Sequence, residues 1–97
     1  MTAFKNSTIR TPLSDVSDLG SLQSITEDTL RELIATGVVR VLQVIHHGNA
    51  GWAVLVRVGV QNRVVRSQRE KIRTWRSLDT VASWAAGLGA VAVEVIL

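Results

Sequence analysis

Hydrophobic residues recur at the spacing of an α-helix in two segments, residues 24–36 and residues 78–87. In the first segment the recurring positions are Leu30, Leu33 and Ile34. In the second they are Leu78, Val81, Ala82 and Ala85, and Leu88, directly after the segment, continues the spacing. Side chains three and four positions apart share one face of a helix, so each segment predicts a short amphipathic helix. Helices this short are not stable alone, and both must pack against another element.

Residues that favour helix ends flank both segments. Ser24 and Glu27 have the spacing of a capping box, and Thr26 is a rival for the N-cap position. Gly37 suits the C-terminal end of the first helix. Ser77 is the expected N-cap of the second helix, and a nearby glycine is expected to end it.

Strict alternation of apolar residues with other residues predicts β-strands. It is clearest in residues 52–60, where one face carries Trp52, Val54, Val56, Val58 and Val60. The other predicted strands are residues 38–47, 63–68 and 90–96. The first three strands form a meander, whose second reversal is expected at Gln61 and Asn62, because Asn tolerates positive φ. Residues 69–75 fit either a loop or a short fourth strand.

The last predicted strand, residues 90–96, has two interpretations. Its near-continuous apolar run, AVAVEVI, favours a position in the middle of the sheet. At a sheet edge, the same strand would invite pairing with a second copy of the chain or with another protein.

Together these elements predict one α+β domain over residues 23–97. A valine-rich hairpin needs one face covered, and two short helices can cover it. We expect two layers, with a mainly antiparallel sheet of about three to five strands and two short helices. Residues 1–22 show neither the helical nor the strand spacing of hydrophobic residues, and they contain the single proline, Pro12. They therefore predict a flexible N-terminal arm.

Composition narrows the environment of the protein. The chain has no cysteine, which excludes disulfides and thiolate metal sites. It has no apolar run of about 18 residues that could span a membrane, and residues 1–15 lack the apolar core of a secretory signal. We therefore expect a cytoplasmic protein. Aromatic residues are scarce, and Trp52 and Trp84 are expected to pack in an aliphatic core or at a dimer interface.

Positive charge is concentrated in one part of the chain. Residues 57–76 hold seven basic side chains and one acid, whereas the residues before them hold four basic and five acidic side chains. The seven are Arg57, Arg63, Arg66, Arg69, Lys71, Arg73 and Arg76, with Trp75 among them. Basic groups on a hairpin and its following loop can bind DNA phosphates, and a tryptophan can stack on a base. We therefore predict that these eight residues bind DNA on one positive surface.

Two other interpretations of this charge remain open. The basic side chains could form the solvated face of an amphipathic sheet, which resists edge-to-edge aggregation, or they could meet an acidic protein partner. If the partner is DNA, phosphate contacts should dominate and sequence preference should be weak. The reason is that the nearby amides suited to base edges are only Gln61, Asn62 and Gln68.

No arrangement of residues suggests catalysis, a metal ion or a cofactor. His46 and His47 are adjacent, so on a strand they point to opposite faces and would not bind one metal ion together. No serine lies in a nucleophile motif, and the glycine-containing segments are too short for phosphate loops. Glu94, inside an apolar strand, is expected to pair with an arginine or to face water. We expect a protein that is not an enzyme.

Three segments resemble the ParC-type partition-associated proteins of plasmids and integrative conjugative elements. They are LRELIATGVVR (30–40), GWAVLVRVG (51–59) and RTWRSLDTVASWAAGLG (73–89). Trp75 stands at the aromatic position of the family pattern, and the residues in register after it are Leu78, Asp79, Thr80, Leu88 and Gly89. The resemblance implies an accessory or regulatory role in the partition or maintenance of a plasmid or another mobile genetic element.

The order of strands and helix is also loosely similar to the arm-binding domains of tyrosine integrases and to AP2-like domains, which dock a sheet on DNA. Two functional hypotheses follow. The first is a non-enzymatic maintenance protein that binds DNA through its basic hairpin. The second is a protein-interaction module, such as an antitoxin or inhibitor encoded on a mobile element, that binds an acidic protein partner. Its possible partners include a protein of a partition or toxin–antitoxin system and a second copy of the chain.

Overall fold

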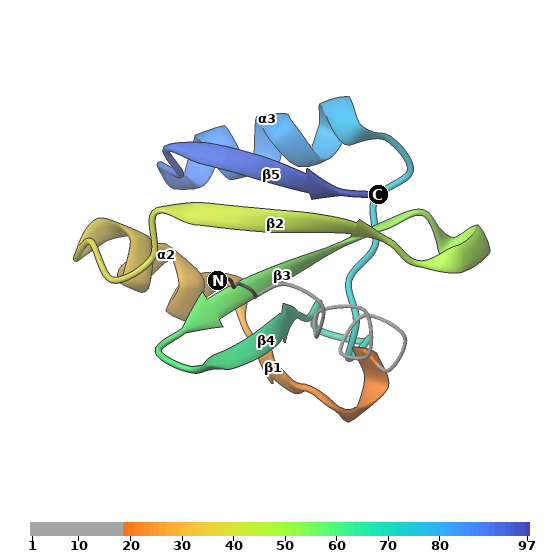
Figure 1. Ribbon diagram of the computed structural model, residues 1–97, viewed down its shortest axis with the longest axis horizontal. Coiled ribbons are helices and arrows are strands. Elements are labelled where there is room, and N and C mark those ends of the chain that lie inside the picture. The colour runs from red at the N-terminus through yellow and green to blue at the C-terminus, as the bar shows by residue number, and fades with distance from the viewer. Residues whose placement is uncertain (1–18) are drawn as a thin grey trace, which may run out of the picture.

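The computed structural model describes residues 19–97, which form a five-stranded sheet and two α-helices (Figure 1). The strands are β1 (Gln23–Ile25), β2 (Val41–His46), β3 (Trp52–Val58), β4 (Gln61–Val65) and β5 (Ala92–Ile96). The helices are α2 (Glu27–Ala35) and α3 (Leu78–Leu88), with 3-10 turns at η1 (Leu19–Ser21) and η2 (Gly48–Ala50). The predicted α+β class is confirmed. Most of the predicted N-terminal arm, residues 1–18, lies outside the described residues.

The sheet is mixed, with the strand order β1-β4-β3-β2-β5. The pairs β2–β3 and β3–β4 are antiparallel, as the meander predicts, whereas β1–β4 and β2–β5 are parallel. A crossover connection through a helix allows the two strands that it joins to run in the same direction. Since α2 joins β1 to β2 and α3 joins β4 to β5, the sheet is mixed rather than mainly antiparallel.

Hydrophobic alternation does not predict β1. This strand has three residues, and its last residue, Ile25, is buried and pairs with Val65. Ser24 lies within the strand, so the capping box that begins at Ser24 is not formed. The rival N-cap is correct, because the Thr26 hydroxyl accepts a 3.3 Å hydrogen bond from the Thr29 N–H.

The reversal between β3 and β4 lies two residues earlier than predicted. Val58 pairs with Gln61, so the turn consists of Gly59 and Val60. Gly59 has a φ of +65°, which two-residue hairpin turns require and which glycine adopts without steric cost. Gln61 and Asn62 are therefore the first two residues of β4.

Residues 66–76, here called the exit segment, form a loop and not a full fourth strand. An isolated bridge joins its end to β3: the Trp52 N–H donates to the Trp75 carbonyl at 2.8 Å, and the Trp75 N–H donates back at 2.8 Å. Ser77 then caps α3 as predicted, accepting from the Thr80 N–H at 3.2 Å. The exit segment is thus fixed to the sheet at the point where α3 begins.

β5 lies at an edge of the sheet, so the interpretation that favours a central position is wrong. α3 packs against β5 and runs along it in Figure 1. Val93 is half-buried, whereas the Val95 residue remains 40% exposed. An apolar strand can occupy an edge when a helix covers part of it.

The main core lies between the two helices and one face of the sheet. Its helical residues are Leu30 from α2 and Val81, Ala85 and Leu88 from α3, so both helices cover the same face. Its strand residues include Ile25, Leu42, Val44, Val54, Val56 and Val65. Trp52 and Trp84 pack against this core, which confirms their predicted positions.

A smaller apolar cluster lies on the opposite face of the sheet. It consists of Leu19, Ile45, Ala53, Leu55 and Val64, with Leu22 and Ile72 packed against it. The middle of the sheet is therefore buried on both faces, in part by η1 and the exit segment. In the part of the chain that the structure describes, no helix is long and apolar enough to cross a bilayer.

Candidate nucleic-acid interface

The hairpin arginines project from opposite faces of the sheet. Arg57 pairs with Asn62 and Arg63 pairs with Val56 in the β3–β4 ladder. Neighbouring residues on a strand alternate between faces, so the Arg57 and Arg63 side chains point in opposite directions. Arg57 is exposed, and Arg63 is half-buried with its Nη2 atom 3.5 Å from Gln61 Oε1. The two hairpin cations therefore do not share one surface of the sheet.

Arg73 and Trp75 take part in the packing between the helices and the exit segment. The Arg73 Nη1 atom donates a 2.9 Å hydrogen bond to Glu27 Oε1 at the start of α2. Its guanidinium carbon lies 4.7 Å from the Trp75 ring centre and 5.5 Å from that of Trp84. Trp75 is only 6% exposed, which leaves little of its ring for stacking on a base.

Glu27 is the centre of this packing. Its Oε1 atom also accepts a 3.0 Å hydrogen bond from Trp84 Nε1, and its Oε2 atom accepts one of 2.7 Å from Arg31. The indole hydrogen bond, followed by the Arg73 and Arg31 contacts, lowers the pKa of the Glu27 carboxyl, and partial burial opposes that shift. From the sequence we predict only a capping role for Glu27. Its spacing of four residues from Arg31 is typical of an ion pair on a helix, and that pattern could have indicated the Arg31 contact.

The other six predicted cations make no ion pair with any acid in residues 19–97. They are Arg57, Arg63, Arg66, Arg69, Lys71 and Arg76. Two of them bond to backbone oxygens: Arg66 Nε to Ser67 at 3.2 Å, and Lys71 Nζ to Gly20 at 2.6 Å. None of the six is therefore held in an ion pair by a described side chain.

The first half of the exit segment is a self-bonded loop. The Ser67 hydroxyl accepts from the N–H groups of Arg69 at 3.3 Å and Glu70 at 2.9 Å, and the Ser67 N–H donates to the Glu70 carbonyl at 3.0 Å. These bonds fix the backbone from which Arg69 and Lys71 extend as exposed side chains. The loop thus presents cations on a defined backbone.

A groove of about 830 Å³ separates this loop from the beginning of α2. Its charged lining consists of Arg66, Arg69, Arg73, Glu27, Asp28 and Glu70. Three cations face three carboxylates, so the groove has no excess of positive charge. It is not suited to holding a phosphate by itself.

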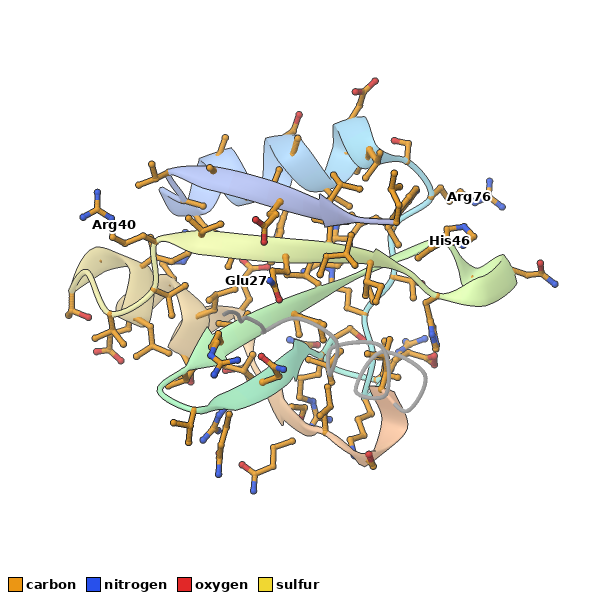
Figure 2. The ribbon with its side chains drawn as sticks, in the orientation of Figure 1. Glu27, Arg40, His46 and Arg76 are labelled. Carbon is orange, nitrogen blue, oxygen red and sulfur yellow. The ribbon has the colours of Figure 1, made fainter. Side chains whose placement is uncertain are left out.

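Arg76 and Arg40 lie at opposite ends of the molecule. Figure 2 shows Arg76 and His46 together at one end of the molecule, with Arg40 at the other end. The His46 ring packs edge-on against Trp52, with 4.9 Å between ring centres. Among the described residues, no group of three His, Asp or Glu side chains is placed to hold a metal ion. Glu94 is exposed and accepts a 3.1 Å hydrogen bond from Gln43 on the neighbouring strand.

Comparison with known proteins identifies the family. No curated protein and no solved structure is detectably similar to the chain. A model of the ParC-like family matches residues 25–96, which run from the end of β1 to the end of β5 and include both helices. The match confirms the resemblance seen in the sequence. The chain belongs to the ParC-like family.

Proposed function

We propose that this ParC-like protein is a non-enzymatic accessory of plasmid or mobile-element maintenance that binds DNA in the cytoplasm. The observation that carries the proposal is the set of six cations on the hairpin and the exit segment that form no ion pair with any acid in residues 19–97. The family assignment supports the maintenance role, because ParC-type proteins accompany partition systems.

The physical basis of the proposal is the affinity of unpaired cations for phosphate. Each Lys or Arg that neutralises a phosphate releases condensed counterions, and this release supplies most of the affinity of sequence-independent DNA binding. Arg57 and Arg63 lie on opposite faces of one hairpin, so the hairpin presents one cation to each side of a duplex groove. Arg66, Arg69 and Lys71 extend the contact along the exit segment.

Binding of a random-sequence duplex at low salt tests this proposal. We expect Arg66→Ala combined with Arg69→Ala to weaken binding to all sequences alike, because both residues are assigned to phosphates. Arg40→Ala removes an exposed cation on the β5 side of β2 (Figure 2) and should leave the affinity nearly unchanged. Absence of binding at low salt, or an equal loss in the Arg40 variant, would contradict the proposal.

A second candidate function is protein interaction through the edge of β5. Within residues 19–97 no strand pairs with the outer side of β5, and the neighbouring Val91 is 68% exposed. Exposed apolar edge strands pair readily with other strands, so a second copy of the chain or a partition or toxin–antitoxin partner could add here.

Sedimentation analysis tests the homodimer form of this candidate. The wild-type chain should have twice its monomer mass at micromolar concentration. Val95→Lys should return it to the monomer mass, because lysine on an edge strand opposes strand pairing. A wild-type chain that stays monomeric at all concentrations would contradict the homodimer.

A further inference from the structure

The end of the β3–β4 hairpin extends beyond the ladders of both neighbouring strands. β2 pairs with β3 no further than Leu55, and β1 pairs with β4 only from Arg63 onward. Residues 57–62, here called the hairpin tip, therefore pair only with each other among the described strands. Val60, at the turn, is 87% exposed. In Figure 1 this turn lies at the left margin of the sheet, opposite the connection between β2 and β3.

A shallow groove of about 430 Å³ lies beside the hairpin tip. Its lining consists of Ser21, Leu22, Gln23, Arg57, Val60, Gln61 and Asn62. The polar groups in this set are one hydroxyl, three carboxamides and one guanidinium, and the set contains no carboxylate. The Arg57 side chain makes no hydrogen bond or ion pair within residues 19–97, and it is exposed. The hairpin tip thus differs from the exit segment, where cations predominate and carboxamides are few.

This combination of groups matches base edges better than phosphates. An arginine fork binds the O6 and N7 atoms of guanine, and a glutamine amide binds the N6 and N7 atoms of adenine. A valine at the turn can contact the methyl group of thymine. Two strands lie about 4.8 Å apart, so a two-stranded ribbon with its side chains fits a major groove about 12 Å wide.

We propose that the hairpin tip enters the major groove of duplex DNA end-on and reads base edges through Arg57 on one face of the hairpin and Gln61 on the other. This inference rests on the proposed DNA-binding function, since the cations of the exit segment hold the flanking phosphates. Contacts between the exit-segment cations and phosphates would not depend on DNA sequence. The base contacts of the hairpin tip would add a sequence preference. Arg57 is therefore assigned mainly to a guanine and less to a phosphate.

Selection from a pool of duplexes with a randomised central segment tests the inference. The three proteins compared are the wild type, Arg57→Lys and Arg69→Lys. Lysine keeps the positive charge but loses the rigid two-donor fork, so it replaces arginine better at a phosphate than at a guanine. The wild type should enrich a motif containing guanine. Arg57→Lys should reduce the preference at one base pair by about 10- to 100-fold, and Arg69→Lys should leave the motif unchanged.

A second variant, Gln61→Ala, should relax the preference at a different base pair and leave the guanine in place. Matching thermal unfolding curves for all variants would show that the exposed substitutions leave the fold intact. A motif that survives in Arg57→Lys, or a wild type that binds the pool without enriching any motif, would overturn the reading role and leave the DNA-binding proposal standing. Absence of any binding at low salt would overturn both.

Discussion

The indole nitrogen of Trp84 in α3 donates a 3.0 Å hydrogen bond to Glu27 Oε1 at the first residue of α2. The same oxygen accepts from Arg73 in the exit segment, whose guanidinium lies against the rings of Trp75 and Trp84. The Trp75 and Trp84 ring centres are 4.7 Å apart. One carboxylate therefore links both helices and the segment that carries most of the unpaired cations.

Trp84→Phe should lower the free energy of unfolding by about 1–2 kcal/mol, because it removes a hydrogen bond to a charged acceptor and keeps an aromatic ring in place. Trp52→Phe is the matched control, since Trp52 also packs against the main core but makes no side-chain hydrogen bond within residues 19–97. Urea denaturation measures both. Equal losses in the two variants would show that ring size, and not the Glu27 contact, determines the stability change.

The lowered pKa of Glu27 predicts a pH dependence of stability. The folded-state pKa lies below the unfolded value, so the unfolded chain takes up a proton first as the pH falls. The contribution of Glu27 to stability is therefore complete above the unfolded pKa, near 4.5, and is lost as the pH falls through the folded pKa. Glu27→Gln should flatten the fall in unfolding midpoint below about pH 5. Asp28→Asn, which removes a neighbouring carboxylate without an ion pair, should keep the wild-type profile. Identical profiles in the wild type and Glu27→Gln would contradict the prediction.

Gly51 allows the exit segment to approach β3. A Cβ atom at this position would overlap the carbonyl oxygen of Trp75, and the φ of +109° is itself unfavourable for other residues. Gly51→Ala should break the Trp52–Trp75 bridge and cost about 2–3 kcal/mol or more. Gly87→Ala is the opposite case, because Gly87 lies in α3 with open space around it. It should stabilise the protein by about 0.5–1 kcal/mol. Thermal unfolding separates the two, and a tolerated Gly51→Ala would refute this account of the bridge.

Regular hydrophobic spacing predicts most of the fold. The stripe that ends at Leu88 and the alternation that begins at Trp52 place α3 and β3 almost residue for residue, because burial on one face leaves a period in the sequence. β1 has only three residues, which is too short for a period. β5 can lie at the edge of the sheet because α3 packs beside it. The residues of β5 alone do not show that a helix covers them, so the sequence does not predict the edge position.

The candidate site is less predictable from sequence. A run of basic residues does not show which of them form ion pairs inside the protein and which remain free to bind a partner. Arg73 is neutralised by Glu27, which is 46 residues away in sequence, and no local pattern connects the two. The importance of Arg57 and Gln61 comes from the position of the turn. Because Gly59 and Val60 form the turn, Gln61 lies in β4 beside the groove and not in the turn, where the sequence predicts it.

The dependence of DNA affinity on salt tests the proposed function most directly. Affinity for a random duplex is measured over a series of salt concentrations, for the wild type and for Arg66→Ala combined with Arg69→Ala. About five phosphate contacts predict a slope of log affinity against log salt of roughly −4 to −5 in the wild type. The double variant should be flatter by about 2, because it removes two of those contacts. A slope near zero, an unchanged slope in the double variant, or no binding at low salt would contradict a role for these cations on DNA.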